Sequence, residues 1–124
     1  MSQDDAPVGH QLNRPERYPD LATLLEEIRR KPGMFLGSMA ITRLCHFLDG
    51  IEFAEEIHKL PAEARWIRPW RDDFEEWVAA NYNASRWTLS SFSLAYLSAR
   101  FSEEEGFRLW YRWYDEYQAS RRES

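Results

Sequence analysis

Cysteine and histidine are scarce in this chain of 124 residues, which has one cysteine, Cys45, and three histidines. One cysteine cannot form an internal disulfide, and no Cys-x-x-Cys pair is present to hold a metal ion. This usage is typical of a reducing compartment. His10 lies near the start of the chain, and His46 and His58 fall about 120° apart on one predicted helix. We therefore expect no metal site.

Long apolar runs are also missing from the sequence. No stretch approaches the ~18 apolar residues that a membrane span needs, and the first nineteen residues lack the apolar core of a signal peptide. We expect a cytoplasmic protein that does not contact membranes. The net charge of −5 argues against nucleic-acid binding, which needs a clustered basic surface. An acidic balance is compatible with a basic protein partner, but it is also common among soluble proteins.

Aromatic residues are abundant, at 15% of the chain, and include six tryptophans and six tyrosines. Because aromatic side chains bury large areas, this composition predicts a folded core and not a disordered chain. The length fits one domain. We expect residues 1–19 to form a flexible arm, residues 20–119 a single helical domain, and residues 120–124 a polar tail.

Apolar spacing predicts an all-α fold, a compact bundle of about five helices. The first would start at the cap Asp20 and stop at Pro32 and Gly33, and the others would cover about residues 38–60, 70–82, 85–101 and 102–119. The fourth is apolar on nearly all sides, which predicts a central, buried helix. Ser102 and Glu105 form a capping box before the fifth.

Gly50 falls inside the second predicted helix, which costs roughly 1 kcal/mol relative to alanine. We expect either another element to approach closely there or the helix to break in two. Cys45 lies on the apolar stripe of the same helix and is expected to be inert. The serines of residues 85–101 lack a Gly-x-Ser-x-Gly turn. No group of residues carries a reaction mechanism, so we expect a protein that is not an enzyme and uses no cofactor.

Two groups of carboxylates are candidates for partner binding, and both are expected to be exposed. They favour either an ordinary solvated surface or an acidic patch that docks on a basic partner and speeds association. The first group lies on the second predicted helix and the second near the start of the third: Glu52, Glu55 and Glu56, then Asp72, Asp73, Glu75 and Glu76.

Trp66 and Trp70 alternate with arginines between Arg65 and Arg71. Tryptophan and arginine are enriched in the residues that dominate protein interfaces, so both tryptophans are further candidates for partner binding. The same pattern could stack single-stranded nucleic acid, although the overall charge weakens that interpretation. Core packing under the arginine stems is the third possibility. Tyr111 and Trp113 lie off the main apolar face of the last helix and are also interface candidates.

The most distinctive segment reads Lys-Pro-Gly-Met-Phe-Leu-Gly over residues 31–37. It is followed by Phe-Leu-Asp-Gly-Ile over residues 47–51, by Phe-Glu-Glu-Trp-Val over residues 74–78, and by an isolated Trp87. This order resembles small bacterial immunity proteins of polymorphic-toxin loci, with Ile51 where tyrosine is usual and Val78 where leucine is usual. The resemblance covers about residues 24–97, and its motifs look structural.

The resemblance implies a cytoplasmic inhibitor that binds a cognate toxin domain and blocks its active site or substrate surface. The toxin's chemistry, the binding face and the stoichiometry stay open. The alternative is a small regulatory or adaptor domain that mediates protein–protein contacts and is either monomeric or homodimeric when free.

Overall fold

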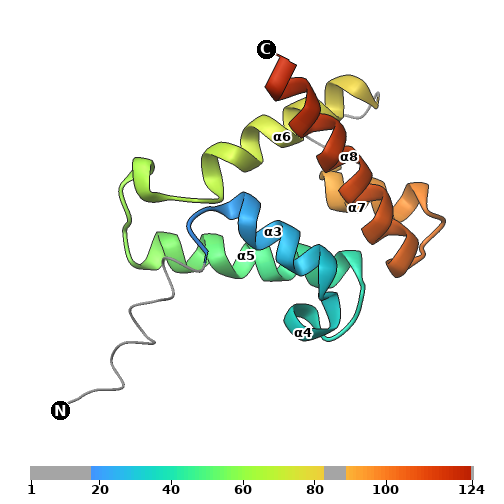
Figure 1. Ribbon diagram of the computed structural model, residues 1–124, viewed down its shortest axis with the longest axis horizontal. Coiled ribbons are helices and arrows are strands. Elements are labelled where there is room, and N and C mark those ends of the chain that lie inside the picture. The colour runs from blue at the N-terminus through green and yellow to red at the C-terminus, as the bar shows by residue number, and fades with distance from the viewer. Residues whose placement is uncertain (1–17, 83–88, 124) are drawn as a thin grey trace.

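The structure, a computed structural model, describes residues 18–82 and 89–123. Over these residues the chain is all-helical and forms one compact domain, which confirms the predicted fold class. The elements are α3 (Leu21–Arg30), α4 (Pro32–Leu36), α5 (Ile41–Ile57), a 3-10 turn (Ala62–Ala64), α6 (Arg68–Asn81), α7 (Ser91–Ser98) and α8 (Glu103–Glu123) (Figure 1).

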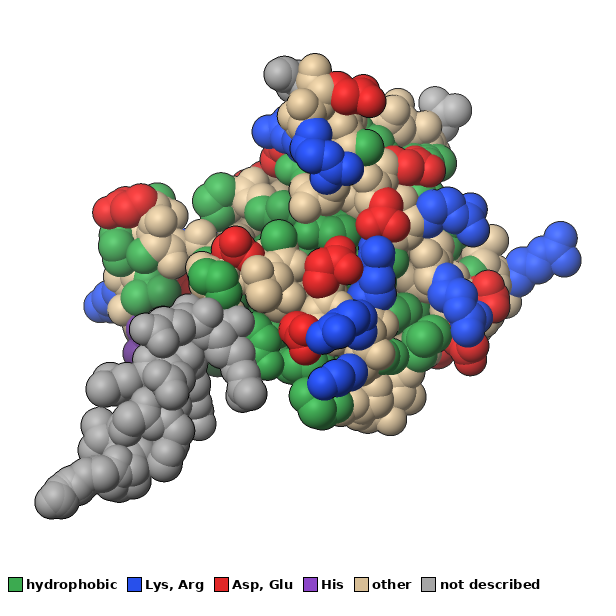
Figure 2. Space-filling view, in the orientation of Figure 1, with side chains coloured by type: hydrophobic (Ala, Val, Ile, Leu, Met, Phe, Trp, Pro, Cys, Tyr) green, Lys and Arg blue, Asp and Glu red, His purple; other side chains and the backbone are tan. Residues whose placement is uncertain are grey.

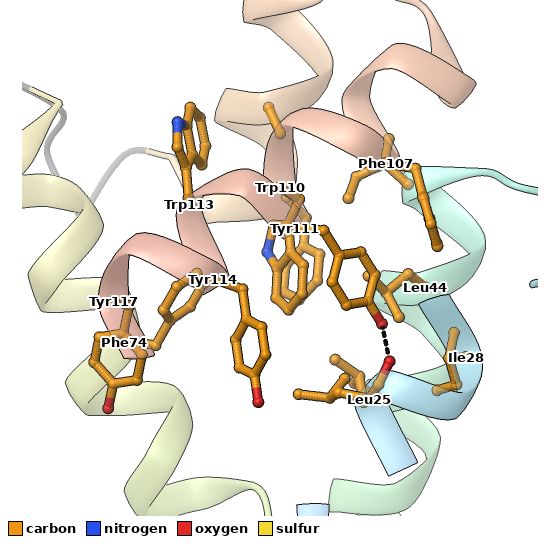
Figure 3. Packing of buried hydrophobic residues seen from close by; sticks show 14 of the residues in the cluster. Leu25, Ile28, Leu44, Phe74, Phe107, Trp110, Tyr111, Trp113, Tyr114 and Tyr117 are labelled. Carbon is orange, nitrogen blue, oxygen red and sulfur yellow. Dashed lines mark hydrogen bonds between the residues drawn. The ribbon is translucent and has the colours of Figure 1, made fainter. Parts of the chain in front are cut away.

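Helix α8 is the centre of the bundle and contacts α5, α6 and α7. The side chains of Trp110, Tyr111 and Tyr114 point into the space between α6 on one side and α3 and α5 on the other, whereas Trp113 points away from it (Figure 3). The hydroxyl of Tyr111 donates a hydrogen bond to the backbone carbonyl of Leu25 at 2.7 Å, which ties α8 to α3. Six of the residues of α8 are large, aromatic and buried: Phe107, Trp110, Tyr111, Trp113, Tyr114 and Tyr117.

Two expectations about the C-terminal half of the chain are therefore wrong. Tyr111 and Trp113 are core residues and not interface candidates, because α8 is covered on more than one side. The central helix is α8 and not residues 85–101. Helix α7 covers only Ser91–Ser98, and Leu97 on its outer side is 44% exposed. Residues 83–88, which include Trp87, lie outside the described part of the chain.

Helix α4 is the element that the sequence did not predict. Residues 34–36 belong to a helix of five residues that starts at Pro32 and has Gly37 as its C-cap. Proline suits this first position because its fixed φ is already helical. The helix ends at Gly37, whose φ of 85° lies in the left-handed region that favours glycine.

Local capping signals were predicted with mixed success. The Asp20 carboxylate accepts from the backbone N–H of Thr23 at 2.8 Å, and this bond lowers the pKa of Asp20. The hydroxyl of Ser102 accepts from the backbone N–H of Glu105 at 3.1 Å, which is half of the predicted capping box. The other half is absent, because the Ser102 N–H donates to the carbonyl of Ala99 at 3.2 Å and the Glu105 carboxylate pairs with Arg108. Helix α5, however, follows Ala40, whose side chain cannot cap it. Instead, Glu103 of α8 accepts from the backbone N–H of Thr42 at 3.0 Å.

Helix α8 continues to Glu123, so residues 120–123, which were expected to form a polar tail, are helical. Ser120 donates to the carbonyl of Tyr117 at 2.9 Å, and Arg121 forms an ion pair with Asp73 of α6 at 3.1 Å. The last turn of the helix is therefore anchored to its neighbour.

Candidate partner-binding surface

The acidic side of α5 and the arginines that follow it bind each other. Arg71 forms ion pairs with Asp49 and Glu52, each at 2.8 Å. Arg68 pairs with Glu52 at 2.9 Å, and Arg65 pairs with Glu56 at 2.8 Å. We call these four ion pairs the α5–α6 ladder, because they join α5 to the start of α6 and to the segment just before it.

The ladder changes the role of Glu52 and Glu56. The sequence suggested an acidic patch and a separate basic aromatic segment, each able to meet a partner. In the structure the carboxylates of α5 and the arginines of this segment neutralise one another. Arg65 also donates to the carbonyl of Leu60 at 2.8 Å. Charge reversal at Glu52 or Glu56 would first disturb the contact between two helices of the same chain. These residues are therefore weak candidates for electrostatic docking.

Glu55 and Glu75 were expected to be exposed, and this is wrong. Glu55 is 7% exposed and accepts from the backbone N–H of Trp66 at 2.7 Å, at the entry to α6. Glu75 is 9% exposed and accepts from both the backbone N–H and the hydroxyl of Ser91, each at 2.6 Å. Both carboxylates bind backbone N–H groups at the start of the next helix, where the helix dipole favours a negative charge. Neither is available to a partner in the folded chain.

The remaining acidic candidates lie on α6. Helix α6 begins at Arg68, so Asp72 and Asp73 lie beyond its first turn, which contains no acidic residue. Asp73 accepts from the hydroxyl of Tyr117 at 2.6 Å. Asp72 and Glu76 are exposed, and both also take part in side-chain interactions. This small acidic strip is what is left of the predicted patch.

Trp66 and Trp70 are half-buried and pack against the hydrophobic core. The Trp70 ring stacks on Phe74 with a centroid distance of 5.4 Å and approaches the ring of Trp110 at 6.2 Å. Of the three interpretations of this segment, core packing therefore agrees best with the structure.

The outward face of α5, which the sequence did not single out, is an exposed apolar surface of the described residues. Phe53 is 66% exposed and Ile57 is 56% exposed. His46, Gly50 and Ala54 are exposed on the same face. The signal was present in the sequence, since Phe53 and Ile57 lie four residues apart and off the buried stripe of this helix.

Gly50 lies in the middle of this face, and the expectation about it is wrong. Helix α5 is continuous through Gly50, and no described residue lies within 4 Å of the position that a Cβ atom would occupy. Neither a break in the helix nor a close neighbour among the described residues compensates for this glycine.

Two depressions border the N-terminal half of this face, and His46 lines both of them. The first, of about 380 Å³, lies between α5 and α7 and is mostly apolar. The second, also of about 380 Å³, lies between α4 and α5. The first is lined by Thr42, Cys45 and His46 of α5, by Phe92, Ser93, Tyr96 and Leu97 of α7, and by Leu89.

The first depression offers little reactive chemistry. Burial, and after it the neighbouring Asp49 carboxylate, raises the pKa of the Cys45 thiol to about 11. Because the thiolate is the nucleophile, a raised pKa lowers the reactivity of Cys45 at neutral pH. In the part of the chain that the structure describes, no three His, Cys, Asp or Glu side chains are grouped to hold a metal ion.

The face formed by α3 and α8 carries mixed charges. Arginine and carboxylate side chains alternate over it without a wide area of one sign (Figure 2). Arg29 pairs with Asp115 at 2.6 Å, and Arg108 pairs with Glu105 at 2.7 Å. Exposed pairs of this kind add little to stability or to directed association.

Titration of buried phenols and of Cys45 gives a prediction for alkaline pH. Burial raises the pKa of Tyr114 to about 12, and it also raises the pKa of Tyr111 and Tyr117. An unfolded tyrosine releases its proton near pH 10 and an unfolded cysteine near pH 8.5. Above these values the unfolded state binds fewer protons than the folded state, so the free energy of unfolding must fall as pH rises.

We expect the free energy of unfolding to decline slightly from about pH 9 and more steeply between about pH 10 and pH 12. Urea denaturation followed by far-UV circular dichroism at pH 8, 9, 10 and 11 measures this. Tyr114→Phe, compared with wild type, should reduce the slope above pH 10. A stability that stays constant from pH 9 to pH 11 would contradict the burial of these groups.

Among the described residues, no helix combines the length and apolar character needed to cross a membrane. Comparison of the chain with protein-family models, with curated proteins and with solved structures gave no match.

Proposed function

We propose that this chain is an immunity protein that binds a cognate toxin domain and blocks its active site or substrate surface. The observation that supports the proposal is the outward face of α5, where Phe53 and Ile57 expose most of their side chains. Large apolar groups exposed side by side are unusual on a monomer and are characteristic of protein interfaces. The resemblance of residues 31–37, 47–51 and 74–78 to immunity proteins suggests that the partner of this face is a toxin domain.

Binding through this face would use burial and shape and would need no cofactor. The bordering depressions can accept apolar side chains of a partner, which is how the dominant residues of interfaces are usually seated. The α5–α6 ladder holds α5 in place beside the face, so the surface is formed before the partner arrives. A preformed surface lowers the entropic cost of association.

Co-expression with the product of the gene directly upstream tests the proposal. We expect that product to arrest growth when produced alone, and growth to be restored when this chain is produced with it. If the upstream product is harmless alone, or if it arrests growth equally in the presence of this chain, the proposed function is wrong.

Phe53→Glu tests whether α5 is the binding face. Because the Phe53 side chain is exposed, we expect its replacement to leave folding unchanged and to weaken binding to the upstream product at least tenfold, since a charge would be buried against an apolar partner. Isothermal titration calorimetry measures the affinity.

Met34→Glu is the matched control, because Met34 of α4 is 67% exposed and lines neither depression beside α5. We expect this variant to bind like wild type. Equal affinities for Phe53→Glu, Met34→Glu and wild type would place the interface elsewhere on the molecule.

A further inference from the structure

We propose that the depression between α5 and α7 is a binding site for a small, neutral, aromatic molecule that carries a hydrogen-bonding group. Such a site would operate whether or not the chain also binds a toxin. A toxin side chain seated in the same depression would displace the small molecule.

The depression has the size of a small-molecule site, and the fold holds its walls in place. Its volume is about 380 Å³, and pockets for small ligands have volumes of about 300–1,000 Å³. On one side, Phe92 of α7 is buried and stacks on Trp110 of α8 at 5.2 Å. On the other side, the Glu103 carboxylate accepts from the backbone N–H of Thr42 at 3.0 Å and from its hydroxyl at 2.9 Å. A ligand that enters such a preformed cavity loses little free energy to ordering of the protein.

The residues around the depression favour a neutral ligand. Among the described residues that line it, none is an aspartate, a glutamate, a lysine or an arginine. Two carboxylates bond to lining residues, and both are already engaged. Asp49, beside Cys45, pairs with Arg71 at 2.8 Å, and both oxygens of Glu103 accept from the Thr42 hydroxyl. A charged ligand would therefore lose its hydration without gaining an opposite charge, which is unfavourable.

The walls also favour an aromatic ligand with a hydrogen-bonding group. Phe92 and Tyr96 supply rings, against which another ring packs well, and Leu97 adds apolar surface. The Tyr96 hydroxyl and the His46 imidazole can take part in hydrogen bonds, and neither forms one with another described residue. A planar ring with an N–H or a hydroxyl group matches this combination.

The test uses indole as the probe and the isotope-labelled full chain without a partner. We expect saturable changes in the backbone NMR signals of the residues that line the depression, with a Kd below about 1 mM, as is reasonable for a ligand of this size. Benzoate, an anion, and benzylammonium, a cation, are similar in size and should bind about tenfold more weakly or less. Benzofuran, which has an oxygen in place of the N–H group, should bind about threefold more weakly.

Ser93→Phe is designed to fill the depression. Ser93 is exposed on α7 and lines the depression, so a ring at this position should occupy the space without disturbing the core. We expect the affinity for indole to fall at least tenfold. Ser98→Phe is the matched control, because Ser98 is also an exposed serine of α7 but does not line the depression. It should bind indole like wild type.

Four results would overturn the inference. They are the absence of saturable changes at the lining residues, equal affinities of wild type and Ser93→Phe for indole, binding of benzoate or benzylammonium as tight as that of indole, and binding of benzofuran as tight as that of indole. The three comparisons of ligands use wild type, so they hold even if Ser93→Phe does not fold. None of the four concerns the toxin, so the proposed function would survive them, and failure of the co-expression experiment would leave this site untouched.

Discussion

Replacing Trp110 by alanine is expected to lower the free energy of unfolding by about 4 kcal/mol, the typical cost of removing a fully buried aromatic side chain. Trp110 is completely buried, and its ring contacts rings from three helices. It stacks on Phe92 of α7 at 5.2 Å and on Tyr114 of α8 at 5.8 Å, and it meets the edge of Phe74 of α6 at 5.2 Å. No rearrangement of one helix could fill the cavity that its loss would leave.

Urea denaturation followed by far-UV circular dichroism measures the change. Trp110→Phe separates packing from hydrogen bonding, because it keeps a ring but loses the indole N–H that donates to the Ser91 hydroxyl at 2.9 Å. We expect this variant to lose about 2 kcal/mol. A loss below about 1 kcal/mol for Trp110→Ala would show that the centre of the core lies elsewhere.

Glu75→Ala is expected to destabilise the chain by about 3 kcal/mol, even though glutamate is rarely a core residue. Its carboxylate accepts two hydrogen bonds from Ser91 at the first turn of α7, and the Ser91 hydroxyl in turn accepts from Trp110. Removing the carboxylate leaves a buried N–H group without an acceptor. Glu75→Gln should cost less, since the amide oxygen can still accept one bond.

A double-mutant cycle with Ser91→Ala measures the coupling between the two side chains, which we expect to exceed 1 kcal/mol. Glu63→Ala is the control, because Glu63 is exposed in the 3-10 turn and should change stability by less than about 0.5 kcal/mol. If Glu75→Ala and Glu63→Ala behave alike, Glu75 is not the buried cap that the structure describes.

Some glutamates cap a helix other than their own, and this explains why the predicted acidic patch is smaller in the structure. Glu55 caps the entry to α6, Glu75 caps α7, and Glu103 caps α5, over separations of 11, 16 and 61 residues. Capping by Asp20 and Ser102 acts over three residues and could be predicted from spacing. A carboxylate that reaches a distant helix has no such spacing, so in the sequence it looks like any exposed acid.

The candidate surface was hidden for a related reason. The sequence marks Phe53 and Ile57 as apolar residues of a helix, but it does not say which apolar residues find a neighbour. Helix α8 supplies so many aromatic groups that the inner side of α5 is filled, and the outer side is left uncovered by the described residues. Likewise, the arginines between Arg65 and Arg71 seemed to form a separate surface until the fold placed them beside Glu52 and Glu56.

The sequence by itself determined the all-helical class, the cap at Asp20, and the ends of helices near Pro32 and before Ser102. It also placed Cys45 in mostly apolar surroundings. These features depend on local spacing and on propensities, which act within one or two turns of chain. Only the tertiary structure decided that α8 is central, that Glu55 and Glu75 are buried, and that Gly50 and Phe53 face outward. Those outcomes depend on which elements meet, and contacts between distant segments leave no periodic signal in a single sequence.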